Sequence, residues 1–137
     1  MAAGVTTVRD CGNEFEFEVA VRDAIDQRRG IGPRMLLAGF AESDSPEAIG
    51  VMRANSPDQA RRLVARYHAA GFVQMKIYNS VRPDIVPAIT AEAHRLGMTV
   101  TGHIPKGMIA YEAIENGLDQ INHVRFIYSM MLPRARM

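Results

Sequence analysis

The 137-residue sequence predicts an α/β fold with a parallel sheet, and three observations support that prediction. Short β-type runs alternate with amphipathic segments of helical period. Helical segments end at a glycine, which tolerates the left-handed conformation that follows a helix, and an apolar residue then opens the next run. This happens four times, at Gly4, Gly71, Gly97 and Gly117. The length suits one domain, so a single domain over residues 1–137 is expected.

The same punctuation predicts the bounds of each element. Five strands are expected, over residues 5–10, 34–39, 72–78, 98–103 and 118–123. Helices are expected between them, over residues 15–29, 57–70, 83–96 and, in a shorter form, 108–116. Ser56 supplies an N-cap before Pro57, and Pro83 opens the next helix in the same way. Residues 41–55 are irregular and are interpreted as a βα loop with room for a short helix.

The third strand indicates that the sheet is a barrel and not an open, doubly wound sheet. Its two faces differ, with Val73, Met75 and Ile77 on one and Gln74, Lys76 and Tyr78 on the other. Open parallel sheets are covered on both faces and read as continuous apolar runs. A (β/α)8 barrel buries only its outer face against helices and tolerates polar groups inside. Such barrels need roughly 250 residues, so this chain is expected to form a partial (β/α)8 TIM barrel.

Composition and charge exclude several classes of protein. The sequence is 47% hydrophobic and 23% charged with a formal net charge of +1, which is typical of a globular domain. No basic stripe and no long apolar segment is present, so neither a nucleic acid nor a membrane is an expected partner. The one cysteine, Cys11, has no intramolecular disulfide partner. The compartment stays open: the sequence as written suits the cytoplasm, and a signal in a longer form would make it secreted.

Three residues carry the expected chemistry, because they lie near the carboxyl ends of three successive strands. They are Lys76, His103 and His123. In a barrel these ends converge on one mouth, so the three side chains are expected around one site. Neutral imidazoles bind zinc and similar divalent metals. Lysine is a poor ligand while protonated, but a neutral amine reacts with carbon dioxide to give a carbamate that can bridge two metals.

The motifs that contain these residues resemble the amidohydrolase superfamily, nearest its imidazolonepropionase-like and prolidase-like members. They are Gly4-Val5-Thr6-Thr7-Val8-Arg9-Asp10, Met75-Lys76-Ile77-Tyr78, Thr101-Gly102-His103-Ile104-Pro105 and Asn122-His123. The resemblance implies that the five strands are strands 2 to 6 of the barrel. It also implies that the cofactor is one or two divalent metal ions, most simply zinc, that a carboxylated Lys76 is the bridge between two metals, and that His103 and His123 are ligands.

The resemblance further implies a metal-dependent hydrolase acting on a carbon–nitrogen bond of an amide, lactam or dipeptide through metal-activated water. The substrate would be a small molecule or dipeptide-like. The family also has a His-x-His pair on its first strand and an aspartate on its last. The chain is expected to lack both and to be truncated at both ends, so we expect the isolated polypeptide to be inactive.

Other polar residues carry weaker expectations. Tyr78 lies on the face of Lys76 and is expected to contact substrate. Asp10 ends a strand, and its carboxylate is expected either to face the mouth and contact substrate or to brace the following loop. His68 and His94 lie on predicted helices, where solvated histidine is the simpler interpretation, so they are not included in the site.

Two other functions stay open at the level of sequence. A half barrel has unpaired strand edges, so the chain could instead be a structural or binding module that associates with itself, as a homo-oligomer, or with another chain. An open-sheet α/β binding domain unrelated to hydrolases is the third interpretation. That domain would have no affinity for metal.

Overall fold

The computed structural model describes residues 3–12, 14–50 and 52–131. Eleven elements follow one another in this part of the chain: β1 (Thr7–Asp10), α1 (Phe15–Asp26), β2 (Arg34–Ala41), α2 (Pro57–Ala69), β3 (Gln74–Ile77), the 3-10 turn η1 (Pro83–Ile85), α3 (Val86–Arg95), β4 (Thr99–Gly102), α4 (Ala110–Glu115), β5 (Gln120–Ile121) and α5 (Arg125–Met131). None of these helices has both the length and the apolar character needed to cross a lipid bilayer.

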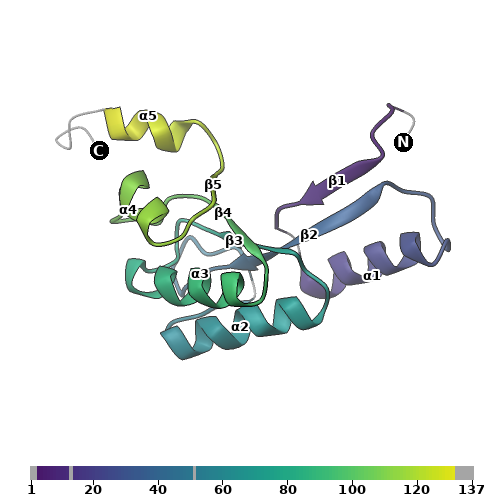
Figure 1. Ribbon diagram of the computed structural model, residues 1–137, viewed down its shortest axis with the longest axis horizontal. Helices are drawn as coiled ribbons and strands as arrows, with labels where there is room; N and C mark the ends of the chain where they lie inside the picture. The colour runs from purple at the N-terminus through teal and green to yellow at the C-terminus, as the bar shows by residue number, and fades with distance from the viewer. Residues whose placement is uncertain (1–2, 13, 51, 132–137) are drawn as a thin grey trace.

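The five strands are all parallel and pair in sequence order, β1-β2-β3-β4-β5. Helices α2 and α3 lie side by side along one face of the sheet, while β1 and α1 extend away from the main body (Figure 1). The sheet is curled, since Arg9 Nη1 on β1 donates a 2.7 Å hydrogen bond to Gln120 Oε1 on β5. The expected fold class, a partial (β/α) barrel, is confirmed.

The glycine punctuation is confirmed after α2, α3 and α4, whereas the end of a helix before Gly4 stays a prediction that the described residues do not test. All four glycines have positive φ, with values of 79° at Gly4, 83° at Gly71, 74° at Gly97 and 94° at Gly117. After α2, the amide of Gly71 donates to the carbonyl of His68, and the amide of Phe72 donates to that of Tyr67. These bonds satisfy the last carbonyls of the helix and turn the chain directly into β3.

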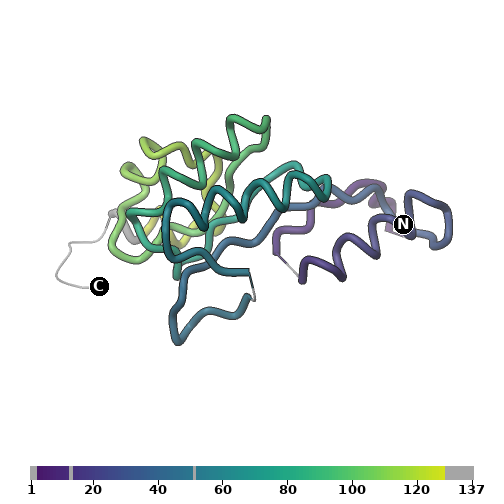
Figure 2. The backbone as a smooth tube through the Cα atoms, turned by 90° about the horizontal axis from the view of Figure 1, so that it is seen from below, coloured from purple at the N-terminus to yellow at the C-terminus, as the bar shows by residue number. Residues whose placement is uncertain are grey.

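The predicted strands and helices exist, most of them with shifted ends, and the larger differences from the prediction are the following. The strand predicted over 118–123 pairs only at Gln120–Ile121, and the helix predicted over 83–96 begins as the 3-10 turn Pro83–Ile85. The described residues of the 41–55 segment form no helix. They form a loop that projects from the rest of the molecule (Figure 2). Helix α5 (Arg125–Met131) was not predicted, because it follows β5 without a glycine or proline signal.

The outer face of the sheet forms the apolar core with the helices. Met75, Ile77 and Val100 are fully buried, and Gly39 lies so close to the Tyr67 ring that a β-carbon there would clash. Tyr67 and Phe72 meet edge to face, with ring centroids 4.8 Å apart. Burying aromatic rings of this size provides much of the driving force for packing α2 on the sheet.

The inner face is polar, as the alternation in strand 72–78 predicted, but much of it is buried. Gln74 is 3% exposed and Thr101 is fully buried. Gln74 Nε2 donates to Thr99 Oγ1 at 2.8 Å, and Thr101 Oγ1 donates to Asn122 Oδ1 at 2.7 Å. Hydrogen bonds between neighbouring strands thus satisfy the Gln74 amide nitrogen and the Thr101 hydroxyl, whereas Gln74 Oε1 is buried without a partner among the described residues.

Tyr67 provides a test of the packing between α2 and β2. Its hydroxyl donates to the Phe40 carbonyl at 3.2 Å, so Tyr67→Phe leaves a buried acceptor short of a partner. We expect the free energy of unfolding to fall by about 1–2 kcal/mol at neutral pH. Burial also raises the pKa of Tyr67 from 10.0 to about 12. The unfolded tyrosine therefore ionises first, and the advantage of the wild type should shrink between about pH 10 and 12.

Urea unfolding followed by circular dichroism at pH 7, 10 and 11.5 measures both effects. Tyr111→Phe, at a tyrosine that is 60% exposed, is the control and should change stability little. An equal loss in both variants at neutral pH would contradict the role assigned to the Tyr67 hydroxyl.

Candidate metal centre

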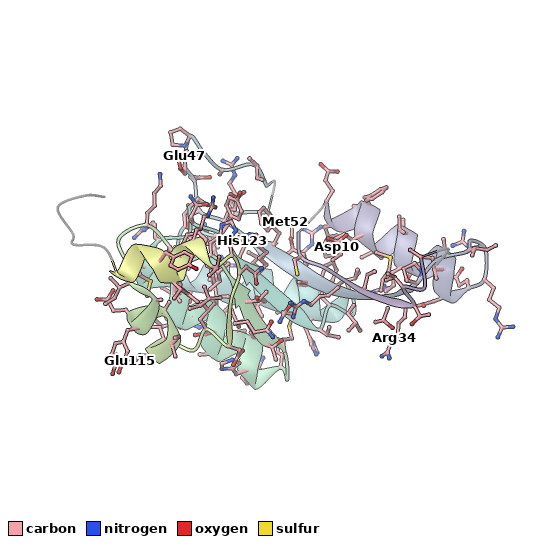
Figure 3. The ribbon with its side chains drawn as sticks, turned by 90° about the horizontal axis from the view of Figure 1, so that it is seen from above. Asp10, Arg34, Glu47, Met52, Glu115 and His123 are labelled. Carbon is pink, nitrogen blue, oxygen red and sulfur yellow. The ribbon has the colours of Figure 1, made fainter. Side chains whose placement is uncertain are left out.

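The carboxyl ends of four strands are tied together at one level by backbone hydrogen bonds. The amide of Tyr78 donates to the carbonyl of Ala41 at 3.1 Å, and that of His103 donates to the carbonyl of Ile77 at 2.9 Å. The amide of Asn122 donates to the carbonyl of Gly102 at 2.7 Å. Because the strands are parallel, the side chains that follow these bonds share the mouth of the half barrel, the end at which barrel enzymes place their sites. Figure 3 labels His123, Met52 and Glu47 toward this end, with Arg34 at the start of β2.

His103 lies at the centre of an aromatic cluster and is only 3% exposed. Its ring centroid is 4.3 Å from that of Tyr78, 4.9 Å from that of His123 and 5.0 Å from that of Phe126. Both ring nitrogens, Nδ1 and Nε2, are buried and have no hydrogen-bond partner among the described residues. A buried imidazole normally has a partner for each nitrogen, so these two require an explanation.

The surroundings of His103 keep its ring neutral. Burial lowers its pKa from 6.5 to about 4, and the positive charge of Lys76 and the neighbouring His123 and Arg125 add to the shift. Neutral imidazole has a free lone pair, which is the form that binds a metal.

Gly102 sets the position of His103. A β-carbon at Gly102, where φ is 148°, would lie 2.0 Å from the carbonyl oxygen of Ile77. Strand β4 therefore approaches β3 more closely at this point than any other residue would allow. The next residue, His103, therefore lies against the end of β3, where its amide donates to the Ile77 carbonyl.

His123 follows β5 in a strained conformation. Its φ is 67°, in the left-handed region that non-glycine residues rarely adopt, and its side chain is exposed. The amide of Phe126 donates to the His123 carbonyl at 3.1 Å, so the turn leads into α5. Strain of this kind is commonly kept at functional sites, where the surrounding structure holds it in place.

Lys76 lies on the inner face beneath these rings, paired in register with Phe40 and Thr101. The side chain is 9% exposed, and Nζ lies 5.9 Å from the centroid of the Tyr78 ring. Among the residues that the structure describes, Nζ forms no ion pair or hydrogen bond. The three predicted residues thus belong to one connected cluster, in which Tyr78 joins Lys76 to His103 and His103 joins Tyr78 to His123.

The donor set fits a metal only in part. Within the described ranges, no group of three His, Cys, Asp or Glu side chains is arranged to hold a metal ion. Two imidazoles and one lysine amine are what the cluster offers. The unpartnered nitrogens of His103 fit a role as ligand, whereas Lys76 fits only as a carbamate, since an ammonium repels cations.

The two weaker expectations concern Tyr78 and Asp10. Tyr78 is half-buried at the mouth, with its ring between Phe40 and His103, and its contact with substrate stays a prediction. Asp10 pairs in register with Leu37, on the helix-covered side of the sheet. Its Oδ1 accepts a hydrogen bond from the Gly12 amide at 3.3 Å, which is the loop-bracing arrangement. A substrate contact for Asp10 is a prediction that this geometry does not favour.

The sequence did not indicate two residues near the mouth, Glu42 and Phe126. Glu42 is 1% exposed, and its carboxylate accepts hydrogen bonds from Ser80 Oγ at 3.1 Å and from the Gly50 amide. Strand β2 was predicted to end at residue 39, so the inward alternation through Phe40 to Glu42 was not followed. Phe126 belongs to α5, the helix that lacks a sequence signal.

No family model and no curated protein matches the sequence. Solved structures do match the fold. A protein described as a prolidase from Bifidobacterium longum superposes with a TM-score of 0.73 at 28% identity, over 87% of this chain and 32% of that one. A bottromycin amidohydrolase gives 0.78 at 21% identity, over 96% and 30%. A Xaa-Pro dipeptidase with bound methionine in its active site gives 0.71 at 21% identity, over 94% and 40%.

The chain spans about 30–40% of the length of these structures. The match covers most of the chain. Hydrolases that act on amide or peptide bonds thus share its architecture. The chain has an amidohydrolase-like fold.

Proposed function

We propose that this chain carries part of the active site of a metal-dependent hydrolase that cleaves carbon–nitrogen bonds. His103 and His123 would hold a divalent metal, most simply zinc. Lys76, as a carbamate, would be a further ligand. The observation that supports the proposal is the His103 ring, which is buried and neutral and has no partner for either nitrogen among the described residues.

The energetic argument is that burying an unpartnered polar group costs roughly 1–3 kcal/mol, and His103 has two such atoms. Coordination by one nitrogen offsets part of that cost. The ring also needs to be held in one orientation to act as a ligand, and contacts with Tyr78, His123 and Phe126 hold it on three sides. An ordinary core position would be filled by an apolar side chain of similar volume.

A bound divalent metal supplies a water molecule activated at neutral pH and polarises a carbonyl oxygen. The chain's own residues do the rest. His103 contributes a lone pair because burial keeps its ring neutral. The Tyr78 and Phe126 rings lie against the His103 ring, which is 3% exposed, and so keep water from that ligand. Tyr78 presents a phenol beside His103 that can orient a bound amide.

The descriptions of the similar solved structures support a proposal for the substrate class. They are described as a prolidase, an amidohydrolase and a Xaa-Pro dipeptidase with bound methionine. For this chain we therefore propose a small amide, lactam or dipeptide-like substrate. The four histidines of the sequence, at positions 68, 94, 103 and 123, include no His-x-His pair. We expect turnover to need residues beyond these 137, and no turnover from them alone.

Metal content tests the ligand assignment. Purified protein supplemented with zinc and then desalted should retain about one ion per chain by atomic emission. The His103→Ala, His123→Ala double variant should retain none, because both imidazole ligands are gone. His68→Ala is the matched control, since His68 is exposed on α2 and should leave zinc content unchanged. Equal zinc in the double variant and the wild type would refute the site.

Carboxylation of Lys76 can be read separately, because the sequence contains only two lysines, Lys76 and Lys106. Protein equilibrated with ¹³C-bicarbonate and zinc should show a carbamate carbon resonance by NMR. Lys76→Arg should remove it, since guanidinium does not form a carbamate under these conditions. Lys106→Arg should keep it, because Lys106 is exposed and paired with Glu47. A resonance lost only in Lys106→Arg would overturn the assignment.

A second candidate function, association through the open side of the half barrel, is favoured by exposed apolar residues. They lie on α4 and α5 and in the turn before α5, at the β5 end of the sheet (Figure 1): Tyr111, Ile114, Val124, Ile127 and Tyr128. Contiguous exposed apolar residues of this kind mark interaction surfaces. Strands β1 and β5 are also the two ends of the described sheet. We propose a homo-oligomer as the simplest partner arrangement.

Sedimentation velocity at several protein concentrations tests this association. We expect the mean mass to rise with concentration, and the Ile114→Arg, Val124→Arg double variant to shift the rise to about tenfold higher concentration, because two charges oppose burial of the patch. Ile31→Arg is the control, at an isolated position that is 96% exposed. A monomer at every concentration would contradict this candidate function.

A further inference from the structure

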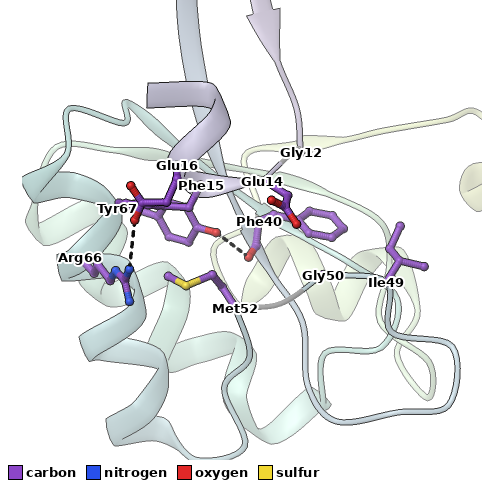
Figure 4. A pocket seen from close by; sticks show the side chains of 10 residues that line it. All are labelled: Gly12, Glu14, Phe15, Glu16, Phe40, Ile49, Gly50, Met52, Arg66 and Tyr67. Carbon is purple, nitrogen blue, oxygen red and sulfur yellow. Dashed lines mark hydrogen bonds and ion pairs between the residues drawn. The ribbon is translucent and has the colours of Figure 1, made fainter. Parts of the chain in front are cut away.

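A cavity of about 410 Å³ opens beside the part of β2 that β1 does not pair with, and one of its lining residues, Phe40, also contacts Tyr78 of the candidate metal centre. Its described lining comes from the loops that follow β1 and β2 and from α1 and α2: Gly12, Glu14, Phe15, Glu16, Phe40, Ile49, Gly50, Met52, Arg66 and Tyr67 (Figure 4). Loops at the carboxyl ends of barrel strands are where substrates bind. The volume lies at the low end of the range for small-molecule sites.

The Phe40 ring connects the cavity to the metal centre. One side of it lines the cavity, and its centroid lies 5.1 Å from that of Tyr78, at an interplanar angle of 63°. Tyr78 in turn contacts His103 at 4.3 Å. A group in the cavity and a bond at His103 are therefore separated by two aromatic rings. A substrate that occupied both places would extend past the Phe40 and Tyr78 rings, with its side chain in the cavity and its scissile amide near His103.

The floor of the cavity offers mainly apolar contacts, because the polar groups of Tyr67 and Arg66 already interact with other residues of the protein. The Tyr67 hydroxyl donates to the Phe40 carbonyl at 3.2 Å. Arg66 lies 4.8 Å from the Phe15 ring centroid and 3.7 Å from Glu16 Oε1. Phe15, Phe40 and Met52 remain to contact a ligand. The rim carries two carboxylates, Glu14 and Glu16, and one guanidinium, Arg66, so a negatively charged group on a ligand is disfavoured there.

We propose that this cavity binds a bulky apolar, uncharged side chain of the substrate, and so selects amides with an aromatic or long aliphatic residue. The inference rests on the proposed function for the identity of the bond that is cleaved. Affinity of the cavity for an apolar amide does not depend on the metal. That difference allows the two claims to fail separately.

The test is a titration of protein labelled with methyl-¹³C methionine, observed by NMR. Met52 lines the cavity, whereas Met75 and Met98 are buried in the core and serve as internal references. N-acetyl-L-phenylalanine amide should shift the Met52 methyl in a saturable way and give an NOE between its phenyl protons and that methyl. N-acetylglycine amide, which has no side chain, should do neither.

Two tryptophan variants locate the binding. Ile49 lines the cavity at its lip and is 74% exposed, so Ile49→Trp should fold normally and weaken the phenylalanine amide by about tenfold through narrowing. Ile31→Trp, at the 96% exposed control position outside the cavity, should leave the affinity unchanged. An absent NOE, or equal responses to the two amides, would overturn the inference.

Repeating the titration with the metal-free His103→Ala, His123→Ala double variant separates the two proposals. An unchanged Met52 response together with no zinc retention by the wild type would support the cavity and refute the hydrolase centre. Zinc retention by the wild type without any Met52 response would refute the cavity and leave the metal centre standing.

Discussion

The parallel pairing of five strands in sequence order is the constraint on which the rest of this structure depends. It places every strand's carboxyl end on one edge of the sheet. Curling then turns that edge into a mouth, and the Arg9 to Gln120 hydrogen bond spans the interior from the first strand to the last. Without this curl, Lys76 and His123 would be separated along a flat edge. The cluster around His103 is thus a product of topology before it is a product of side-chain chemistry.

Much of this could be predicted from the sequence, because the signals were local. Positive φ after a helix demands glycine, so Gly71 and Gly97 marked the helix ends. Alternation along β3 identified the inner face, and with it Lys76. The resemblance pointed to His103 and His123, which the structure brings to a ring separation of 4.9 Å. Whether they bind metal stays a prediction.

What the sequence could not indicate depends on contacts between distant segments. The burial of Glu42 depends on Ser80, in the loop after β3, and on Gly50, further along its own loop. Phe126 reaches His103 only because α5 turns back at His123. The cavity beside Phe40 requires the loops after β1 and β2 to meet α2. None of these contacts produces a periodic pattern or a motif in the sequence.

The polar inner face determines what can lie against the concave side of the sheet. A curled sheet with an apolar concave side would collapse or aggregate if that side faced water. Here the interior carries Arg9, Gln74, Thr99 and Gln120, which bond to one another across and along the strands. Such a surface tolerates water as well as protein against it. The concave side of the described sheet can therefore face either water or a further layer of protein while its own hydrogen bonds stay in place.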